Sequence, residues 1–537
     1  MSHGRLTEIS ITNFKCFKEK TTFQLTPLNI IIGRNNSGKS TIIQALLLLR
    51  QTLAEPKQDV VLKLMEGDVD AFNLRELTHG WPSSASEVQG PIIELQWVSR
   101  VDTIAALEKA RDPNREHLAN WADVPWLKTP PDFVTIKSTL QVSYIEINGS
   151  VRIKEILATA CREGDHNNYP ITRIDIRNDY SSWVCQWNNN LADRIEIALD
   201  HFIPHLQIDR NKVGPRLGQR AWHNAYLILF EPPLDDLKSL LLEFHYLGAQ
   251  RGHPPSLYRP ATEDIRNIGA DGMRAAQLLH RSQNESVHYL APISMDENGK
   301  LLFQNRIIEA PLIQAVQDIM HNLSISTPLK VFEIESIGFQ LKFGQASLSH
   351  VGRGLGYLLP VVILGLYTDP LRFTMTEEEM DIDKYSDKCH TISHLAIEEP
   401  ESHIHPKVAS RLAHYFVSLA LAQRQLIIET HSDHLVRRLR GLVARAQPGS
   451  YIEKWLLENV QIISVSQNQS GCSKVNISRL TKEGGIGKFW PEDFMDESTE
   501  EESAIYYARL DKKESMPDDS HQVIMEEGDE PEGDAVP

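Results

Sequence analysis

The sequence contains few cysteines and no closely spaced cysteine pair. The five cysteines, Cys16, Cys161, Cys185, Cys389 and Cys472, are scattered over 537 residues. Disulfide frameworks and cysteine-based zinc sites rely on closely spaced cysteines. We therefore expect neither, and we expect a protein of the cytoplasm, where thiols stay reduced.

Long apolar segments are missing as well. The longest apolar run, from Tyr357 to Tyr367, spans 11 residues and contains Pro360. A membrane-spanning helix needs about 20 apolar residues, and the first residues contain no apolar stretch of the signal-peptide type. We therefore expect no membrane association and no export. A heptad repeat is also absent between Lys39 and Gly352, which argues against a long coiled-coil arm.

Basic charge is scarce, but only in one part of the chain. The formal net charge is −17, and the segment from Glu492 to Pro537 holds 17 acidic and 3 basic residues. The rest of the chain is therefore nearly neutral, which leaves nucleic-acid binding open to it. Because the end of the chain is acidic and polar, we expect residues 498–537 to be mostly disordered, as a solubilising tail or a partner tether.

A phosphate-binding loop stands near the start of the chain. It comprises Gly33, Arg34, Asn35, Asn36, Ser37, Gly38, Lys39 and Ser40, and Thr41 follows it. The apolar run over residues 28–32 predicts a buried strand, and residues 41–49 predict a helix. A strand, a glycine loop and a helix in this order are typical of nucleotide-binding proteins.

Each residue type in this loop has a chemical reason. Gly33 and Gly38 allow the backbone to wrap closely around a polyphosphate, so that N–H groups and the helix N-terminus point at it. The Lys39 ammonium can reach the terminal phosphates, and the Ser40 hydroxyl can ligate Mg²⁺. We expect ATP and Mg²⁺ to bind here.

A second candidate segment lies far along the chain. Residues 394–397 predict a short buried strand that ends in Glu398 and Glu399. If this strand lies beside the phosphate loop, one carboxylate can hold Mg²⁺ and the next can polarise the attacking water. We assign the metal role to Glu398 and the catalytic base role to Glu399.

Another buried strand is predicted shortly afterwards. A helix beginning at Pro406 leads to a strand over residues 425–429, which His431 follows. A histidine at the mouth of the same parallel sheet can hydrogen-bond the γ-phosphate of ATP. We therefore predict a catalytic sensor role for His431.

These three segments carry a family resemblance. Residues 33–40, 398–406 and 429–432 resemble the core motifs of ABC-type ATPases related to RecF, SMC proteins and the overcoming-lysogenization-defect (OLD) proteins. The resemblance covers most of residues 1–495 and includes Tyr246-Leu247-Gly248 with Arg251. The segment 490–494 is similar to the ending of stand-alone AAA-family ATPases of bacterial antiphage defence operons.

The resemblance implies an α/β fold: an ABC-type P-loop ATPase head with β-rich and helical insertions. It also implies a homodimer or higher oligomer, in which each ATP lies between the phosphate loop of one subunit and a signature helix of the other. By position the signature is residues 348–354, with Gly352 and Gly354 as contacts, although the usual serine and paired glycines are not in order here. The glutamine loop of such proteins has two candidates, Gln89 and Gln96.

The resemblance further suggests an output in antiphage defence, by sensing or handling DNA or by licensing a partner effector encoded nearby. Arg437, Arg438 and Arg440 lie on a predicted helix, where they could follow a DNA backbone or merely form a solvated face. The Toprim nuclease domain of some relatives is not evident, since Asp381-Ile382-Asp383 precedes the carboxylate strand.

Two other functions stay open. One is a nucleotide-gated scaffold with little turnover, which the irregular signature favours. The other is a metal-dependent phosphoesterase built from His403, His405, His431, Asp433 and His434, whose residue types suit metal ligation.

We expect five regions: residues 1–100 and 391–497 as two parts of the ATPase head, 101–245 as a helical insertion and β-rich lobe, 246–390 with the signature, and the tail 498–537.

Overall fold

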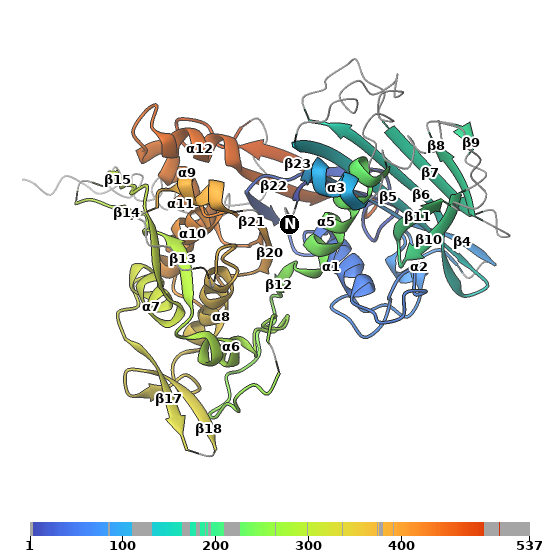
Figure 1. Cartoon of the computed structure of the whole chain (residues 1–537). Coiled ribbons are helices and arrows are strands. Elements are labelled where there is room, and N and C mark those ends of the chain that lie inside the picture. Colours follow the sequence, from blue (N-terminus) through green and yellow to red (C-terminus); the bar gives the residue numbers. More distant parts are fainter. Residues whose placement is uncertain are drawn as a thin grey trace, which may run out of the picture. The chain divides into compact units, whose positions relative to one another are not determined.

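A computed structural model shows the fold of the chain (Figure 1). The described residues are 4–83, 86–109, 132–163, 172–178, 183–187, 190–191, 195–208, 226–263, 265–297, 299–335, 337–372, 374, 380–389, 391–487 and 504. Residues up to Pro491 form one compact unit, and the unit from Glu492 onward is described only at Ala504. The expected acidic tail and the segment 490–494 therefore lie outside the described residues.

The phosphate loop follows a central strand of a six-stranded sheet. In spatial order the strands are β12 (His245–Leu247), β20 (Ser393–Glu398), β21 (Arg424–Glu429), β3 (Leu28–Gly33), β22 (Val460–Gln467) and β23 (Ser473–Arg479). Neighbours are parallel except β22 and β23, which form an antiparallel hairpin. Parallel strands are covered on both faces, which explains why β3 and β21 are buried along nearly their whole length.

Helices cover this sheet. Ile31 of β3 belongs to a large core with the apolar residues of α1 (Thr41–Leu53), while Ile30 points to the opposite face because side chains alternate along a strand. The helix α10 (Pro406–Leu421) contacts β3 and β21. The predicted strand, loop and helix around the phosphate loop are thus confirmed.

A second sheet of eight antiparallel strands shares the core with α1. In spatial order its strands are β2 (Thr21–Gln24), β1 (Arg5–Thr12), β4 (Glu87–Asp102), β5 (Phe133–Ile147), β6 (Ser150–Arg162), β7 (Thr172–Asn178), β8 (Trp183–Trp187) and β9 (Asn190–Leu191). The boundary expected at residue 100 falls inside β4. The β-rich lobe therefore continues the sheet that β1 and β2 begin, because β4 pairs with both β1 and β5.

The other described elements connect or flank these sheets. Before residue 330 they are α2 (Leu74–Leu77), α3 (Thr103–Lys109), β10 (Ile195–Asp200), β11 (Ile203–Ile208), α5 (Glu231–Leu242), α6 (Ala275–Ser282), β13 (Ser286–Leu290), β14 (Ser294–Met295), β15 (Leu301–Leu302), β16 (Ile307–Pro311) and α7 (Leu312–Asn322). From there on they are β17 (Leu329–Ile334), β18 (Gly338–Phe343), β19 (Ala346–Ser347), α8 (Arg353–Tyr367), α9 (Ile382–Lys388), α11 (Asp433–Arg445) and α12 (Tyr451–Asn459).

The helices of the described residues are short. The longest, α10, has 16 residues, so this part of the chain contains no long coiled coil. Among the same residues, no helix combines the length and the apolar composition needed to cross a membrane. The expected helical insertion after Val101 is described only as α3, and residues 110–131 lie outside the described part.

One expected neighbour relation is wrong. The strand that ends in Glu398 does not lie beside β3, because β21 lies between them. The parallel register aligns Glu398 with Glu429 and Glu429 with Ile31, so the three strands end at the same edge of the sheet. The sequence order of strands cannot reveal which strand is inserted between two others.

The helix α5 carries a carboxylate whose pKa is shifted. Burial raises the pKa of Asp236 to about 7; Ser99 opposes this effect and Asp235 adds to it. The folded chain therefore holds this proton more tightly than the unfolded chain. The resulting stabilisation is complete below about pH 4 and is lost as the pH rises through about 7.

We expect Asp236→Asn to stabilise the protein at pH 8, by about 2 kcal/mol, because the substitution removes a poorly solvated charge. The melting temperature of the variant should fall less between pH 5 and pH 8 than that of the natural chain. Asp59→Asn is the control, since Asp59 is exposed and does not contribute to the pKa shift of Asp236. Parallel pH profiles for Asp236→Asn and the natural chain would contradict this assignment.

Candidate nucleotide site

The phosphate loop has the backbone geometry that close phosphate contact requires. Gly38 has a φ of +97°, and a Cβ atom placed there would lie 2.2 Å from the Cys16 Sγ. Gly33 is equally confined, since a Cβ atom would lie 2.2 Å from the Val465 carbonyl oxygen. The loop is therefore tightly packed against Cys16 and Val465 and requires glycine at both positions.

The hairpin β22–β23 and the segment around Cys16 support the loop. The Ser473 hydroxyl donates a hydrogen bond to the Ser37 carbonyl (2.6 Å), and the Ser473 N–H donates to the Cys16 carbonyl (2.9 Å). Ser40 is the N-cap of α1, so the helix N-terminus opens onto the loop. These contacts come from three distant parts of the sequence.

We expect Gly38→Ala to weaken ATP binding at least about tenfold. The added methyl group would collide with Cys16, and the positive φ at this position is unfavourable for alanine. Gly149→Ala is the matched control: Gly149 has a φ of +77°, but a Cβ atom there would have no neighbour within 4 Å. Titration with a fluorescent ATP analogue measures both variants. Equal affinities in the two variants would mean that the collision has no effect on the loop.

Lys39 is buried at the centre of the site. Its side chain is 4% exposed, and its Nζ donates a hydrogen bond to the Arg34 carbonyl (2.8 Å). Burial lowers the pKa of Lys39, and the carboxylates of Glu429, Glu399 and Glu398 oppose this effect. The predicted lysine and both predicted glutamates are thus brought together, and Glu429 joins them.

Glu429 is a site residue to which the sequence analysis assigned no role. It ends β21, and its carboxylate receives a hydrogen bond from the Ser40 hydroxyl. Burial raises the pKa of Glu429 to about 7, and Glu398 adds to the effect. An acidic residue at the carboxyl end of a buried strand was the available signal, as it was for Glu398.

The oxygen donors at this edge of the sheet fit Mg²⁺. Burial also raises the pKa of Glu398, opposed by the Ala249 N–H and by the Tyr246 hydroxyl. Glu399 adds to the raised pKa of Glu398, and Glu398 adds to the raised pKa of Glu429, so a cation between these carboxylates and the Ser40 hydroxyl would relieve their repulsion. Carboxylate and hydroxyl oxygens are the ligands that Mg²⁺ prefers.

Glu399 directly follows β20 in an unusual backbone conformation. Its φ is +44°, and its N–H donates a hydrogen bond to the Glu429 carbonyl (2.8 Å). One carboxylate oxygen accepts a hydrogen bond from the Ser402 hydroxyl (2.9 Å), and the other lies 3.9 Å from the His431 Nε2. A non-glycine residue with this φ costs energy that the surrounding contacts must offset, and here they hold the carboxylate in one orientation.

His431 lies beside Glu399 and close to Lys39. Its backbone N–H donates a hydrogen bond to the Glu401 carboxylate (2.8 Å). Burial lowers the pKa of His431, Lys39 acts in the same direction, and Glu399 opposes them. The imidazole is therefore neutral near pH 7, with one N–H able to donate to a phosphate oxygen.

The loop after β12 supplies further groups that sequence analysis did not assign. The Ala249 N–H approaches the Glu398 carboxylate (3.4 Å), and Arg251 donates to the Glu398 carbonyl (2.9 Å). Arg251 is 8% exposed, and its Nη1 has no partner among the described residues. Gln250 stands between them and is exposed.

The two glutamines predicted as candidates for the glutamine loop lie elsewhere. Gln89 and Gln96 both belong to β4, where Gln89 accepts a hydrogen bond from Lys154 (2.8 Å) and Gln96 one from Thr7 (3.5 Å). In contrast, Gln250 follows the strand next to the one that carries Glu398. Its position makes it the better candidate for that loop.

The signature glycines lie at the start of α8. Gly352 is the N-cap, and a Cβ atom placed on it would have no neighbour within 4 Å. Gly354 packs against the segment that follows Glu399, since a Cβ atom there would lie 2.6 Å from the His403 carbonyl oxygen. The rings of Tyr357 and His403 meet edge to face with centroids 4.9 Å apart. These glycines thus stand at the beginning of a helix.

The arginines of α11 do not share one open face. Arg437 pairs with Asp433 (3.2 Å), whereas the Nε of Arg438 donates to the Ser410 hydroxyl (2.8 Å). The Nε of Arg440 donates to the Gly484 carbonyl (2.7 Å). Arg438 and Arg440 are therefore tied to two different segments, which weakens the expectation of a phosphate-tracking row.

The histidine-rich cluster does not form a metal site. The structure contains no group of three or more His, Cys, Asp or Glu side chains that could hold a metal ion among the described residues, which include His403, His405, His431, Asp433 and His434. Instead His405 is the N-cap of α10, and His434 lies 3.7 Å from Asp433. The metal-dependent phosphoesterase is therefore not supported.

Comparisons with known proteins agree with the site. An AAA ATPase domain family matches residues 5–80 and 369–436, which contain the phosphate loop, Glu398, Glu399, Glu429 and His431. The matched segments of this chain are thus similar to an AAA ATPase domain, and the described residues have a mixed α/β fold. No curated protein matches the sequence.

Solved structures of SMC heads are among the similar folds, all at low identity. An Smc head bound to the C-terminal winged-helix domain of ScpA is 11% identical with a TM-score of 0.37, covering 89% of this chain and 98% of that chain. An Smc head with an extended coiled coil bound to ScpA, from Pyrococcus furiosus, is 10% identical with a TM-score of 0.34, covering 94% and 100%. The SMC head from Thermotoga maritima is 11% identical with a TM-score of 0.29, covering 88% and 98%. TM-scores this low carry no argument about function.

Proposed function

We propose that this chain is an SMC-like, ABC-type ATPase that binds ATP with Mg²⁺ in the cytoplasm and hydrolyses it. The observation that carries the proposal is the meeting of Lys39 and Ser40 with the carboxylates of Glu398, Glu399 and Glu429 at one edge of the sheet. The parallel register aligns Glu398 with Glu429, and all three carboxylates oppose the lowering of the Lys39 pKa by burial. A phosphate loop with only one carboxylate nearby would support ATP binding but not ATP hydrolysis.

In this mechanism the N–H groups of residues 34–40 and the Lys39 ammonium hold the phosphates. Ser40 and Glu398 hold Mg²⁺, which neutralises charge on the phosphate oxygens when bound. Glu399, oriented by Ser402, accepts a proton from the attacking water. The neutral His431 donates its N–H to the γ-phosphate and loses this contact after hydrolysis.

In this proposal, each round of ATP binding and hydrolysis closes and then opens a pair of protomers. The signature start at Gly352 and Gly354 would contact the ATP of the partner subunit, so that ATP closes a homodimer and hydrolysis opens it. The likeness to OLD proteins and to antiphage ATPases motivates the proposal that this cycle handles DNA or licenses a partner effector in antiphage defence. Among Arg437, Arg438 and Arg440, Arg437 is the best placed for a DNA contact, because its side chain is exposed whereas the other two are half-buried.

A nucleotide-gated scaffold is the second candidate. The observation that favours it is the signature, since α8 begins without the serine and paired glycines that contact the partner's ATP in related ATPases. Such a protein would bind ATP and close, but it would turn ATP over slowly.

Phosphate release by the purified chain with ATP and Mg²⁺ tests the enzyme proposal. We expect Lys39→Ala to lower turnover at least about 100-fold, because it removes the charge that holds the terminal phosphates. Lys330→Ala, on the exposed side of β17, is the control and should leave the rate unchanged. Turnover near zero in the natural chain, with ATP still bound, would favour the scaffold. A rate that added duplex DNA fails to stimulate would speak against direct DNA handling.

A further inference from the structure

A cavity lies where β12 and β20 of the six-stranded sheet begin, away from the edge that holds the nucleotide site. It has a volume of about 840 Å³ and is lined by the first residues of β12 and β20, the end of α5, part of α6 and the segment after α8. We call it the rear cavity. Its size is in the range of small-molecule sites, roughly 300–1,000 Å³.

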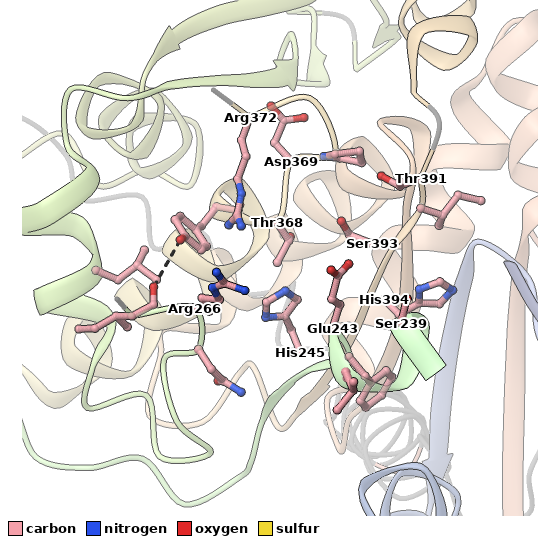
Figure 2. Close-up of a pocket in the computed structure, with 18 of the residues that line it drawn as sticks. Ser239, Glu243, His245, Arg266, Thr368, Asp369, Arg372, Thr391, Ser393 and His394 are labelled. Carbon is pink, nitrogen blue, oxygen red and sulfur yellow. Dashed lines mark hydrogen bonds between the residues drawn. The ribbon is translucent and has the colours of Figure 1, made fainter. Parts of the chain in front are cut away.

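The rear cavity is polar and charged at distinct places. Figure 2 shows Arg266, Arg372 and His245 toward one side of the cavity and Glu243 and His394 toward the other. Hydroxyl groups of Thr368 and Ser393 also line it. The cavity therefore offers cationic donors at one side, and a carboxylate acceptor and the Ser393 hydroxyl toward the other (Figure 2).

The position of Arg372 is held by its neighbours. Its guanidinium group stacks on the Tyr367 ring, 4.2 Å from the centroid, and its Nη1 donates to the Tyr367 carbonyl (3.2 Å). Burial lowers the pKa of His245, and the charges of Arg372 and Arg50 act in the same direction. The imidazole of His245 is therefore neutral, in a part of the cavity that favours an anion.

One carboxylate that lines the cavity does not oppose an anion. Asp369 accepts hydrogen bonds from the Tyr385 hydroxyl (2.6 Å) and lies 2.9 Å from the His288 Nδ1, with Arg424 at 3.6 Å. Its charge is compensated within the core. Glu243 and Glu285 are the other carboxylates that line the cavity, and they can meet the N–H groups of a ligand.

We propose that the rear cavity binds a phosphate-bearing small molecule of mononucleotide size. Arg266 and Arg372 would hold the phosphate, since guanidinium groups suit phosphate oxygens in charge and geometry. Apolar side chains of Leu240, Ile265 and Leu278 would contact a planar ring. Glu243 would accept hydrogen bonds from ring or amino N–H groups.

The cavity is connected to the nucleotide site by three elements. β12 and β20 begin at the cavity and end at the Ala249 loop and at Glu398, about 16 Å away for a six-residue strand. The helix α1 begins at Ser40, and its Arg50 donates a hydrogen bond to the Phe244 carbonyl (2.7 Å) next to His245. A ligand in the rear cavity is thus placed to change ATP turnover, a consequence that rests on the proposed ATPase function, whereas its binding does not.

Binding is measured by equilibrium dialysis on the full Lys39→Ala chain, in which the phosphate loop is disabled. The probes are AMP, GMP, CMP, UMP and inorganic phosphate. We expect at least one mononucleotide to bind more tightly than phosphate, and we expect Arg266→Gln and Arg372→Gln, each added to Lys39→Ala, to weaken it at least about tenfold. Arg445→Gln, at the exposed end of α11, is the control and should bind normally.

Two results would overturn the proposal: no mononucleotide bound at millimolar concentration, or equal binding by the Arg266→Gln, Arg372→Gln and control chains. Phosphate bound as tightly as every mononucleotide would overturn the ligand class. Melting temperatures report whether the variants fold, and Arg372→Lys, which keeps the charge, should retain more affinity than Arg372→Gln. Since the assay needs no hydrolysis, its failure leaves the ATPase proposal intact, and an inactive ATPase leaves a positive binding result intact.

Discussion

Replacing Glu399 with glutamine is expected to lower the turnover of ATP about 100- to 1,000-fold while ATP binding is retained. Glutamine keeps the size of the side chain and its hydrogen bond from Ser402, but it cannot accept a proton from water. The contacts that hold the phosphates come from residues 34–40 and do not involve Glu399. The loss should therefore appear in kcat and leave the affinity for ATP nearly unchanged.

The geometry explains why no other carboxylate should replace Glu399. Glu398 and Glu429 both lie at the ends of their strands, and burial raises the pKa of each, with a nearby carboxylate adding to the effect. Glu401 accepts a hydrogen bond from the His431 N–H and is turned toward the segment after β21. Glu399 alone combines a hydroxyl contact from Ser402 with a position beside His431.

Phosphate release at saturating ATP measures the rate, and a fluorescent ATP analogue measures the affinity. Glu335→Gln, an exposed glutamate next to β17, is the matched control and should behave as the natural chain. A rate that Glu399→Gln leaves unchanged would remove Glu399 from the mechanism. Loss of ATP binding in Glu399→Gln would instead indicate a structural role for its strained backbone.

The local parts of the site could be predicted because their signals are short in sequence. The glycine spacing from Gly33 to Lys39, the apolar run before it and the helix after it all lie within one short segment. The strands ending in Glu398 and Glu429 each contain a short run of apolar residues, and this signal can be recognised without knowing which strands pair with them. Each pattern predicts a helix or a strand and the residue at which it ends. The carboxyl ends of neighbouring parallel strands then lie at one edge of the sheet.

The non-local parts could not be predicted in the same way. Which strand lies between two others, which hairpin supports the loop and which glutamine reaches the site all depend on pairing partners far apart in sequence. Arg251 and Ser473 take part in such contacts, and no spacing rule links them to Gly38. The continuation of one sheet across residue 100 has the same cause, since β4 pairs on both sides.

The basic helix shows a third kind of limit. A helical projection places Arg437 and Arg440 on one face, but it ignores what packs against that face. In the structure Arg440 is bonded to the Gly484 carbonyl and Arg438 to Ser410, so both are partly buried. Counting basic residues on a helix therefore overestimates the charge that is available to a phosphate backbone.

A glutamate at Gly352 is expected to abolish turnover in the natural homo-oligomer, with a loss of at least about 100-fold, while each subunit folds normally. A Cβ atom at this position would have no neighbour within 4 Å. The φ of Gly352 is −53°, which any residue can adopt. If the start of α8 contacts the γ-phosphate of the partner's ATP, a carboxylate there repels it.

Mixing two inactive variants separates this contact in trans from a contact within one subunit. Gly352→Glu keeps its phosphate loop, and Lys39→Ala keeps its signature helix. A mixed dimer then contains one intact site, formed by the phosphate loop of the first chain and the α8 start of the second. With random exchange at equal amounts, about one quarter of the natural turnover should return.

The outcome of mixing depends on which subunit supplies the signature. If Gly352 acted on the ATP of its own chain, every site in the mixture would be broken and no activity would return. If Gly352 lay far from any ATP, Gly352→Glu alone would be active and no mixing would be needed. Gly354→Ala cannot serve in this test, because its methyl group would lie 2.6 Å from the His403 carbonyl oxygen and would disturb the segment that follows Glu399 in the same subunit. Only recovery after mixing supports a site shared between two protomers.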